Sequence, residues 1–387
     1  MESTFRHQPT SFPQPRFSRK NLGSFELRVA HDTAKNSFDA QGNVVGLLNF
    51  NGSTNLLKRF VNTTLPYNNT ETFGKAIMSA ELSTLQYNFT LTQNFGSHFF
   101  AYCSITTSQD TLKNLLIQPI TNNCLLISQT DIDANPTFKT YLQDLQNLLT
   151  NNNCDSGIIQ NNIGPTVFTI GYTTSLTDFK HLDFIDITAQ TGICLPLTPL
   201  DKNQPVLSAL PFTHNVNLGI PVMVNCAFGL YDWLNLGATG LLTVFIKNDQ
   251  IIPLNTTRTN NAVLICEQGL TEVAHHPFLY FNTYFEAEQL IPRLTCLFAL
   301  TYAKQFATSY KTTDQTKFPN ILVNQYPTHH AWELLNLVFS GELDLSQDNY
   351  RIMPRIKCMY VLPVWGASVF KTSELMGQFA IECTYSF

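Results

Sequence analysis

The sequence predicts an all-β chain that folds into an antiparallel, up-and-down β-barrel. Three observations predict this fold. Apolar residues alternate with polar or small residues over many stretches, charged residues make up only 13% of the 387 residues, and short connections between the stretches alternate with long ones. Strict alternation indicates a strand with one apolar face and one polar face, because successive side chains of a strand point to opposite sides.

The clearest alternation covers residues 214–230, "HNVNLGIPVMVNCAFGL". Every second residue from Val216 to Leu230 is apolar, and the residues between them are polar or small apart from Met223. The pattern resumes over 234–246 after the short link "YDW". A link this short predicts that the two stretches form a hairpin.

The same pattern predicts twelve strands in all. We expect them at 23–30, 83–92, 96–107, 167–176, 184–193, 214–230, 234–246, 278–289, 294–304, 328–340, 353–365 and 376–387. A weaker candidate at 44–50 would raise the number to fourteen if it found a partner.

The connections between these strands fall into two alternating classes. Short ones are expected at 93–95, 177–183, 231–233, 290–293 and 341–352, and long ones at 31–75, 108–163, 195–213, 247–275, 305–327 and 366–375. The sequence therefore predicts a single barrel domain, 23–387, with tight turns and both termini at one rim and long loops at the other. Residues 1–22 are interpreted as a tail or plug, and 137–153 in the longest loop as a short amphipathic helix.

Composition excludes several classes of protein. The net charge of −5 is too small for a nucleic-acid-binding protein. No stretch reaches the length of about 18 apolar residues that a membrane-spanning helix needs. The nine cysteines show no metal-ligand spacing, so we expect no metal and no cofactor. Cys124 and Cys154 lie in one predicted loop and could form a disulfide.

The polar phase of the strands suits a water-filled lumen better than a surface in bulk water. It carries Thr, Asn, Gln and Ser with few Lys or Glu, whereas the exteriors of soluble proteins are rich in charge. Twelve strands also enclose more space than the side chains of one phase easily fill. We therefore expect the apolar phase to face lipid hydrocarbon and the polar phase to face the lumen.

Charged residues inside the predicted strands keep mostly to the polar phase, where they would line the lumen. A charge on the lipid-facing side would cost a few kcal/mol, about 2–4 for Arg or Lys at the midplane. The expected lumen-lining ladder consists of Glu26, Arg28, Asp186, Glu286, Glu288, Arg355, Lys357 and Glu382. It either shapes the field of a pore, with a weak preference for cations, or serves as a purely structural network. Glu81 departs from this pattern unless the strand phase changes near Ser83.

The last strand, "FAIECTYSF", carries a more specific pattern. Apolar residues stand at alternate positions up to the end of the sequence: Phe379, Ile381, Cys383, Tyr385 and Phe387. In this feature the chain resembles bacterial outer-membrane β-barrel proteins of the porin-like type. The resemblance implies an outer-membrane location, contact with outer-membrane lipid, and a carboxy-terminal signal read by the barrel-assembly machinery. The amino terminus departs from the family, because "MESTFRHQPTSFPQPRFSRKNLG" contains no apolar core of an export signal.

The expected function is a passive channel for small polar solutes. Two alternatives remain open at this point: a structural or adhesive barrel plugged by its loops, and an outer-membrane lipid hydrolase. The hydrolase is the weaker alternative, because Ser97, His98 and the doublets at 275–276 and 329–330 do not form a Ser/His/acid set in the lipid-facing phase. We therefore expect the chain not to be an enzyme.

Overall fold

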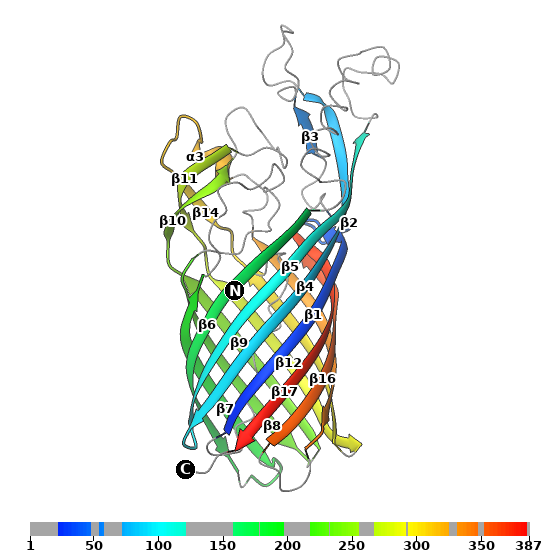
Figure 1. Cartoon of the computed structure of the whole chain (residues 1–387), viewed down its shortest axis with the longest axis vertical. Coiled ribbons are helices and arrows are strands. Elements are labelled where there is room, and N and C mark those ends of the chain that lie inside the picture. The colour runs from blue at the N-terminus through cyan, green and yellow to red at the C-terminus, as the bar shows by residue number, and fades with distance from the viewer. Residues whose placement is uncertain are drawn as a thin grey trace.

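The chain forms a tall closed barrel with additional structure above one rim (Figure 1). The computed structural model describes residues 22–47, 54–57, 72–120, 158–177, 179–196, 217–231, 233–254, 267–291, 293–324, 331–346 and 352–384. Several predictions lie outside these residues: most of the tail at 1–22, the helix at 137–153, the pair Cys124 and Cys154, and the terminal aromatics Tyr385 and Phe387. None of the helices in the described part of the chain has the length and apolar content needed to cross a bilayer.

Twelve antiparallel strands close the barrel, as the sequence predicted. In spatial order they are β1 (Leu22–Phe38), β17 (Val369–Thr384), β16 (Ile352–Ala367), β15 (Trp332–Asp344), β13 (Leu294–Gln305), β12 (Phe278–Ile291), β9 (Leu234–Phe245), β8 (Gly219–Leu230), β7 (Phe184–Leu195), β6 (Ile158–Leu176), β5 (Phe99–Ile120) and β4 (Thr72–Phe95). The pairing of β1 with β4, from Gly23 opposite Gln93 to Ala34 opposite Leu82, closes the ring.

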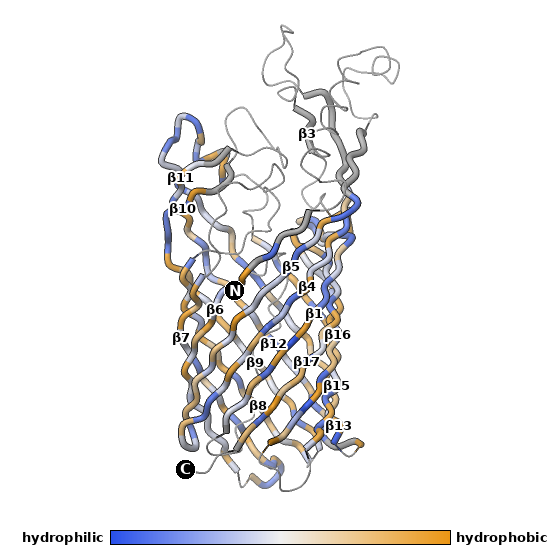
Figure 2. Tube along the Cα trace, viewed as in Figure 1, coloured by the Kyte–Doolittle hydropathy of each residue, from blue (hydrophilic) through white to orange (hydrophobic). Residues whose placement is uncertain are grey.

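The apolar residues of the alternating pattern point outward and the polar or small residues point into the lumen, as the period-two pattern predicted. Along β8, the outward residues Ile220, Val222 and Val224 are 41–50% exposed, whereas Met223 and Asn225 between them are buried. Figure 2 shows hydrophobic and hydrophilic residues alternating along the barrel strands. The apolar residues of the 216–230 row that the structure describes therefore point outward, and they do not form the core of a soluble protein.

The two rims differ in their connections. At the rim that we call the turn end, which holds Leu22 and Thr384, short links join β4 to β5, β6 to β7, β8 to β9 and β12 to β13. The opposite rim, which we call the loop end, carries the long connections with one exception. The loop expected at 366–375 is wrong, since β16 and β17 meet in a tight turn at Ser368. Ser368 adopts a left-handed φ of 53°, and its backbone N–H donates to the carbonyl oxygen of Asp39.

Strands on one side of the barrel are longer than the alternation suggested. β1 continues to Phe38, β5 to Ile120, and β4 begins at Thr72. The loops expected at 31–75 and 108–163 are therefore too wide. The polar residues of these segments adopt strand conformation because neighbouring strands extend alongside them and pair with them.

The fourteen-strand alternative is not adopted by the barrel. Short strands β2 (Val44–Gly46) and β3 (Thr54–Leu57) extend the sheet beside β1 and β4 but take no part in ring closure. In the turn between β1 and β2, the side-chain amide of Asn43 donates to the carboxylate of Asp39, and this hydrogen bond lowers the pKa of Asp39.

A small second sheet stands at the loop end, where only loops were expected at 247–275 and 305–327. It consists of β10 (Asn248–Leu254), β11 (Glu267–Ala274) and β14 (Ser309–Thr312), followed by the one-turn helix α3 (Asn320–Asn324). The Asn217 side chain joins it to the barrel by donating to the carbonyl of Val273. This sheet was not predicted because its strands are too short to show a clear alternation.

Candidate functional site in the barrel lumen

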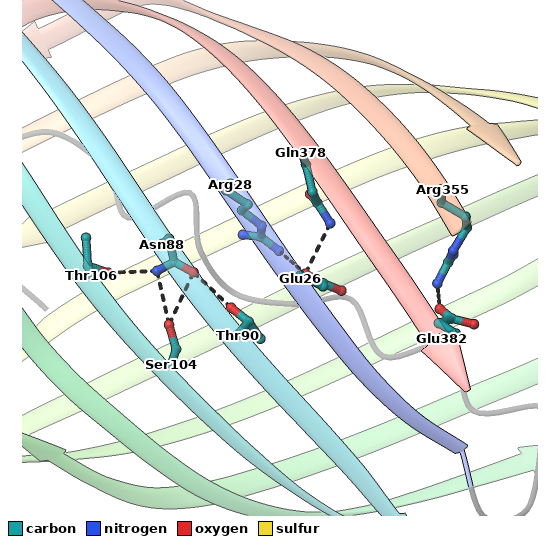
Figure 3. A network of polar contacts seen from close by, with 9 residues as sticks. All are labelled: Glu26, Arg28, Asn88, Thr90, Ser104, Thr106, Arg355, Gln378 and Glu382. Atoms are coloured by element: carbon teal, nitrogen blue, oxygen red, sulfur yellow. Dashed lines mark hydrogen bonds and ion pairs between the residues drawn. The ribbon is translucent and has the colours of Figure 1, made fainter. Parts of the chain in front are cut away.

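The lumen is lined mainly by hydroxyl and amide side chains. On β4 and β5, the inward residues Thr84, Asn88, Thr90, Ser104 and Ser108 are all buried. Asn88 lies at the centre of a small network, in which its side-chain nitrogen donates to Ser104 Oγ at 3.0 Å and to Thr106 Oγ1 at 2.7 Å. The Thr90 hydroxyl donates to its oxygen at 2.8 Å (Figure 3).

A charge network lies near the turn end. Arg355 on β16 reaches both neighbouring strands: its guanidinium contacts Glu382 on β17 and donates to Glu342 on β15 at 3.0 Å. The side chains of Arg355, Glu342 and Glu382 are only 12–15% exposed. Glu342 was not identified from the sequence, because its strand was expected to end at residue 340.

The first strand holds a second part of this network. Arg28 donates to Glu26 at 3.1 Å, and the Gln378 amide of β17 donates to the same Glu26 oxygen at 3.1 Å (Figure 3). Glu26 therefore accepts hydrogen bonds from Arg28 on its own strand and from Gln378 on the neighbouring strand. Glu382 stands opposite Ser24 of β1 rather than opposite Glu26 or Arg28.

The remaining predicted lumen charges are spread around the ring. Lys357 on β16 stands opposite Glu342 on one side and Gln378 on the other. Glu288 accepts a hydrogen bond of 2.9 Å from the Asn235 amide across β9. Glu286 stands opposite Asn235 and Leu297, and Asp186 opposite Ser175 and Ala227. The structure therefore groups Glu26, Arg28, Arg355 and Glu382 near one seam of the barrel, and Asp186, Glu286 and Glu288 on other strands.

Two apolar clusters cover the wall opposite this seam. The cluster nearer the loop end combines large inward side chains of β9, β12 and β15 with Phe38, among them Phe245, Phe278, Trp332 and Leu334. A second cluster below it contains Tyr284, Leu297, Val338 and Val361. Tyr284 and Trp332 are both more than 90% buried and face inward.

A continuous row of uncharged polar side chains separates these clusters. Each residue stands directly opposite the next on the neighbouring strand, and every member is buried. We call this set the Asn/Thr row: Thr173, Thr188, Asn225, Thr239, Asn282, Thr301 and Asn336, on β6, β7, β8, β9, β12, β13 and β15.

The Asn/Thr row is partly hydrogen-bonded within itself. Thr173 and Thr188 share a hydroxyl hydrogen bond of 3.0 Å, and the Thr239 hydroxyl donates to the Asn225 oxygen at 2.8 Å. The side-chain oxygen of Asn282 is buried and has no hydrogen-bond partner within the described part of the chain. Such an oxygen offers an acceptor to a polar molecule in the lumen.

A second row, at the seam but nearer the loop end, carries three acids that the sequence prediction missed. Asp32 on β1 stands opposite Glu374 on β17 and opposite Thr84 on β4, which stands opposite Asp110 on β5. We call these four residues the acidic row. The predicted strands ended at 30 and 107 and began at 376, so all three acids had been assigned to loops. The alternation gave no clear signal there, because the segments around Asp32 and Asp110 carry polar residues on both faces.

Two ion pairs of the described residues lie on the outer face. Lys304 and Glu333 form an ion pair of 2.7 Å, with the Tyr302 hydroxyl donating to the other Glu333 oxygen at 2.8 Å. Glu81 also faces outward and pairs with Lys35 at 2.9 Å. The suggested phase change near Ser83 is wrong, because Leu82 and Thr84 point inward on the regular alternation.

His98 and His275 contact residues close to them in the structure. His98 stacks on Tyr172 with ring centroids 5.4 Å apart and contacts the carbonyl of Thr173 at 3.0 Å. His275 hydrogen-bonds the Thr308 hydroxyl at 3.1 Å. Residues 329–330 lie outside the described part of the chain.

Comparisons with known proteins identify the architecture. No family model matches the chain, and no curated protein matches its sequence. Among solved structures, it is similar to the COG4313 outer membrane channel of Pseudomonas putida F1, with a TM-score of 0.55 and 6% identity over 96% of this chain and 99% of the other. The transport unit of the Escherichia coli autotransporter AIDA-I aligns over 98% and 94% of the two chains, with a TM-score of 0.39 and 7% identity.

At 6% identity, the similarity to the Pseudomonas putida channel concerns the fold alone. A closed antiparallel barrel with an apolar outer face satisfies every backbone hydrogen bond within the wall while presenting apolar side chains to lipid. The chain therefore has the architecture of a membrane-spanning β-barrel, the fold that it shares with the outer membrane channel of Pseudomonas putida F1.

Proposed function

We propose that the chain is an outer-membrane channel through which small polar solutes diffuse passively. The Asn/Thr row carries this proposal. It follows seven adjacent strands, offers hydroxyl and amide groups to the lumen, and bears no formal charge. The strands of a barrel tilt against the barrel axis, so directly opposed residues on successive strands lie at successive heights in the lumen. The row therefore places hydrogen-bond donors and acceptors at successive heights along the lumen. These groups would replace part of the hydration of a permeating solute.

The proposal is tested by reconstituting the full chain in liposomes and planar bilayers. We expect discrete single-channel currents and swelling of the liposomes in small neutral sugars. Replacing the row member Asn282 by Leu should slow swelling, since it removes an acceptor from the lumen wall. The matched control is Thr283→Leu, on the same strand but on the outer face. Equal swelling rates for Asn282→Leu and the unaltered protein would contradict a role for the row.

A second candidate function is a plugged structural barrel. The close burial of large side chains such as Phe278 and Trp332 near the loop end favours it. Conductance separates the two candidates. Currents and swelling support the channel, whereas a well-folded barrel that shows neither supports the structural function.

We also propose that the charged ladder contributes to the field in the channel. Substituting Glu286 and Glu288 by Lys should shift ion selectivity toward anions, and unchanged reversal potentials would contradict their contribution. The carboxy-terminal pattern ending at Phe387 is proposed as the signal for the barrel-assembly machinery. Deleting Phe387 should lower the amount of assembled barrel in cells, and normal insertion would count against that proposal.

A further inference from the structure

We propose that the acidic row makes this channel select cations, so that positively charged small solutes pass in preference to anions. The inference rests on the proposed channel function and adds the charge class of its solutes. It concerns Asp32, Glu374 and Asp110 together with the hydroxyl of Thr84. These residues lie nearer the loop end than the charge network around Arg355.

The register brings the three acids together on four adjacent strands. Asp32 stands directly opposite Glu374, and Thr84 stands directly opposite both Asp32 and Asp110. Side chains in such directly opposed positions have Cβ atoms about 5 Å apart. Asp32 and Asp110 are therefore separated by two strand spacings, about 10 Å. All three acids are at most 4% exposed.

The surroundings preserve the effect of these charges. The Gln86 amide donates to Asp32 Oδ2 at 2.9 Å, and the Ser108 hydroxyl lies 3.5 Å from Asp110 Oδ2. Among the other inward residues of the same strands at neighbouring levels, Thr372 is polar and buried. The rest are apolar and buried: Ala30, Ala34, Leu82, Leu112 and Met376. Charges removed from bulk water in this way are screened weakly by salt.

Thr84 provides an independent indication that the row interacts with a solute in the lumen. Its residue is fully buried, at 0% exposure, and its hydroxyl oxygen has no hydrogen-bond partner among the described residues. A buried hydroxyl in this position costs free energy unless a partner reaches it. Standing between two aspartates, this oxygen is suited to contact a cation or an ammonium group.

Electrostatics then gives the sign of the selectivity. Ionising several buried carboxylates at neighbouring positions costs free energy unless positive charge is close, so the ionised row and a cation in the lumen stabilise each other. The row therefore favours a cation at this level of the lumen and repels an anion. No group of three or more His, Cys, Asp or Glu in the described ranges is arranged to hold a metal ion, so the row acts through its field on mobile cations rather than as a chelating site.

The test is the reversal potential of the full chain in a planar bilayer under a KCl gradient. We expect the unaltered protein to prefer K⁺ over Cl⁻. Asp32→Asn and Glu374→Gln should each lower the K⁺/Cl⁻ permeability ratio by about threefold, because each removes one focusing charge. Thr84→Val keeps all charges and should lower the ratio by less. Heat-modifiable migration in gels checks that each variant is folded.

The matched control is Glu81→Gln, since Glu81 lies on the same strand as Thr84 but on the outer face, paired with Lys35. This variant should keep the original permeability ratio. Channels of the unaltered protein that prefer Cl⁻ or show no preference would overturn the inference without the use of any variant, and so would folded Asp32→Asn channels with the original ratio. In both results the channel function itself would stand. Absence of current and of solute flux would instead overturn the proposed function and the selectivity with it.

Discussion

The two walls of the lumen differ although their outer faces are alike. The wall built from β17, β1, β4 and β5 presents acids, Arg28 and a hydrogen-bonded network around Asn88. The facing wall, from β8 to β15, presents most of two apolar clusters divided by the Asn/Thr row. Phe38 of β1 and Val369 of β17 complete the cluster nearer the loop end. Outside, both walls expose large apolar residues, such as Phe89 on β4 and Phe281 on β12.

This comparison shows which constraint acts on each face. Lipid imposes one rule on every outward residue, because a polar group facing hydrocarbon is costly wherever it stands on the ring. The lumen imposes no single rule. An inward side chain must instead suit its neighbours on the adjacent strands, by packing in one wall and by hydrogen bonding or charge pairing in the other.

The largest expected effect is on the apolar wall. Phe278 on β12 is completely buried, so Phe278→Ala should leave a cavity and lower the free energy of unfolding by about 3–5 kcal/mol. Phe281→Ala on the same strand removes an outward ring that is 50% exposed and should cost less. Unfolding in urea from lipid vesicles measures both. Equal losses would mean that packing within the lumen adds nothing beyond contact with lipid.

A somewhat smaller effect is expected for the charged side of the lumen. Arg355→Met leaves Glu342 and Glu382 without their shared guanidinium at low exposure, which should cost about 3 kcal/mol. Lys304→Met breaks the outward pair with Glu333, whose side chains are 28% exposed, and should cost about 1 kcal/mol or less. The same urea titration compares them. If the two losses were alike, the inner network would be no more important than the surface pair.

The smallest expected effect concerns the uncharged network. Asn88→Leu removes two donated hydrogen bonds and the acceptor of Thr90, with an expected cost of about 2 kcal/mol. Its control is Phe89→Leu on the adjacent outward position, which keeps an apolar side chain toward lipid. A destabilisation by Asn88→Leu no larger than that of its control would show that the polar wall tolerates apolar substitution as the facing wall does.

Much of the fold could be predicted from the sequence. The twelve strands follow from the period-two alternation in the sequence of each strand, and so does the side to which nearly every strand residue points. Glu26, Arg28, Arg355 and Lys357 were assigned to the lumen on the same ground. Arg355 and Glu382 of the same ladder meet because consecutive strands of a meander are neighbours.

Other features could not be predicted, for physical reasons that concern particular residues. Asp32, Asp110 and Glu374 stand in polar segments that become strand only because neighbouring strands extend beside them. The tight turn at Ser368 depends on a left-handed backbone conformation and on a hydrogen bond to Asp39, far away in the sequence.

The sequence by itself determined that the chain has strands and which side of each strand meets lipid. These properties are local, since a residue's face depends only on its place in the alternation. Tertiary structure alone decided how far strands extend and which side chains share a level of the lumen. That information lies in the register between strands, where a shift of one residue changes every neighbour. The acidic row and the Asn/Thr row exist only through that register.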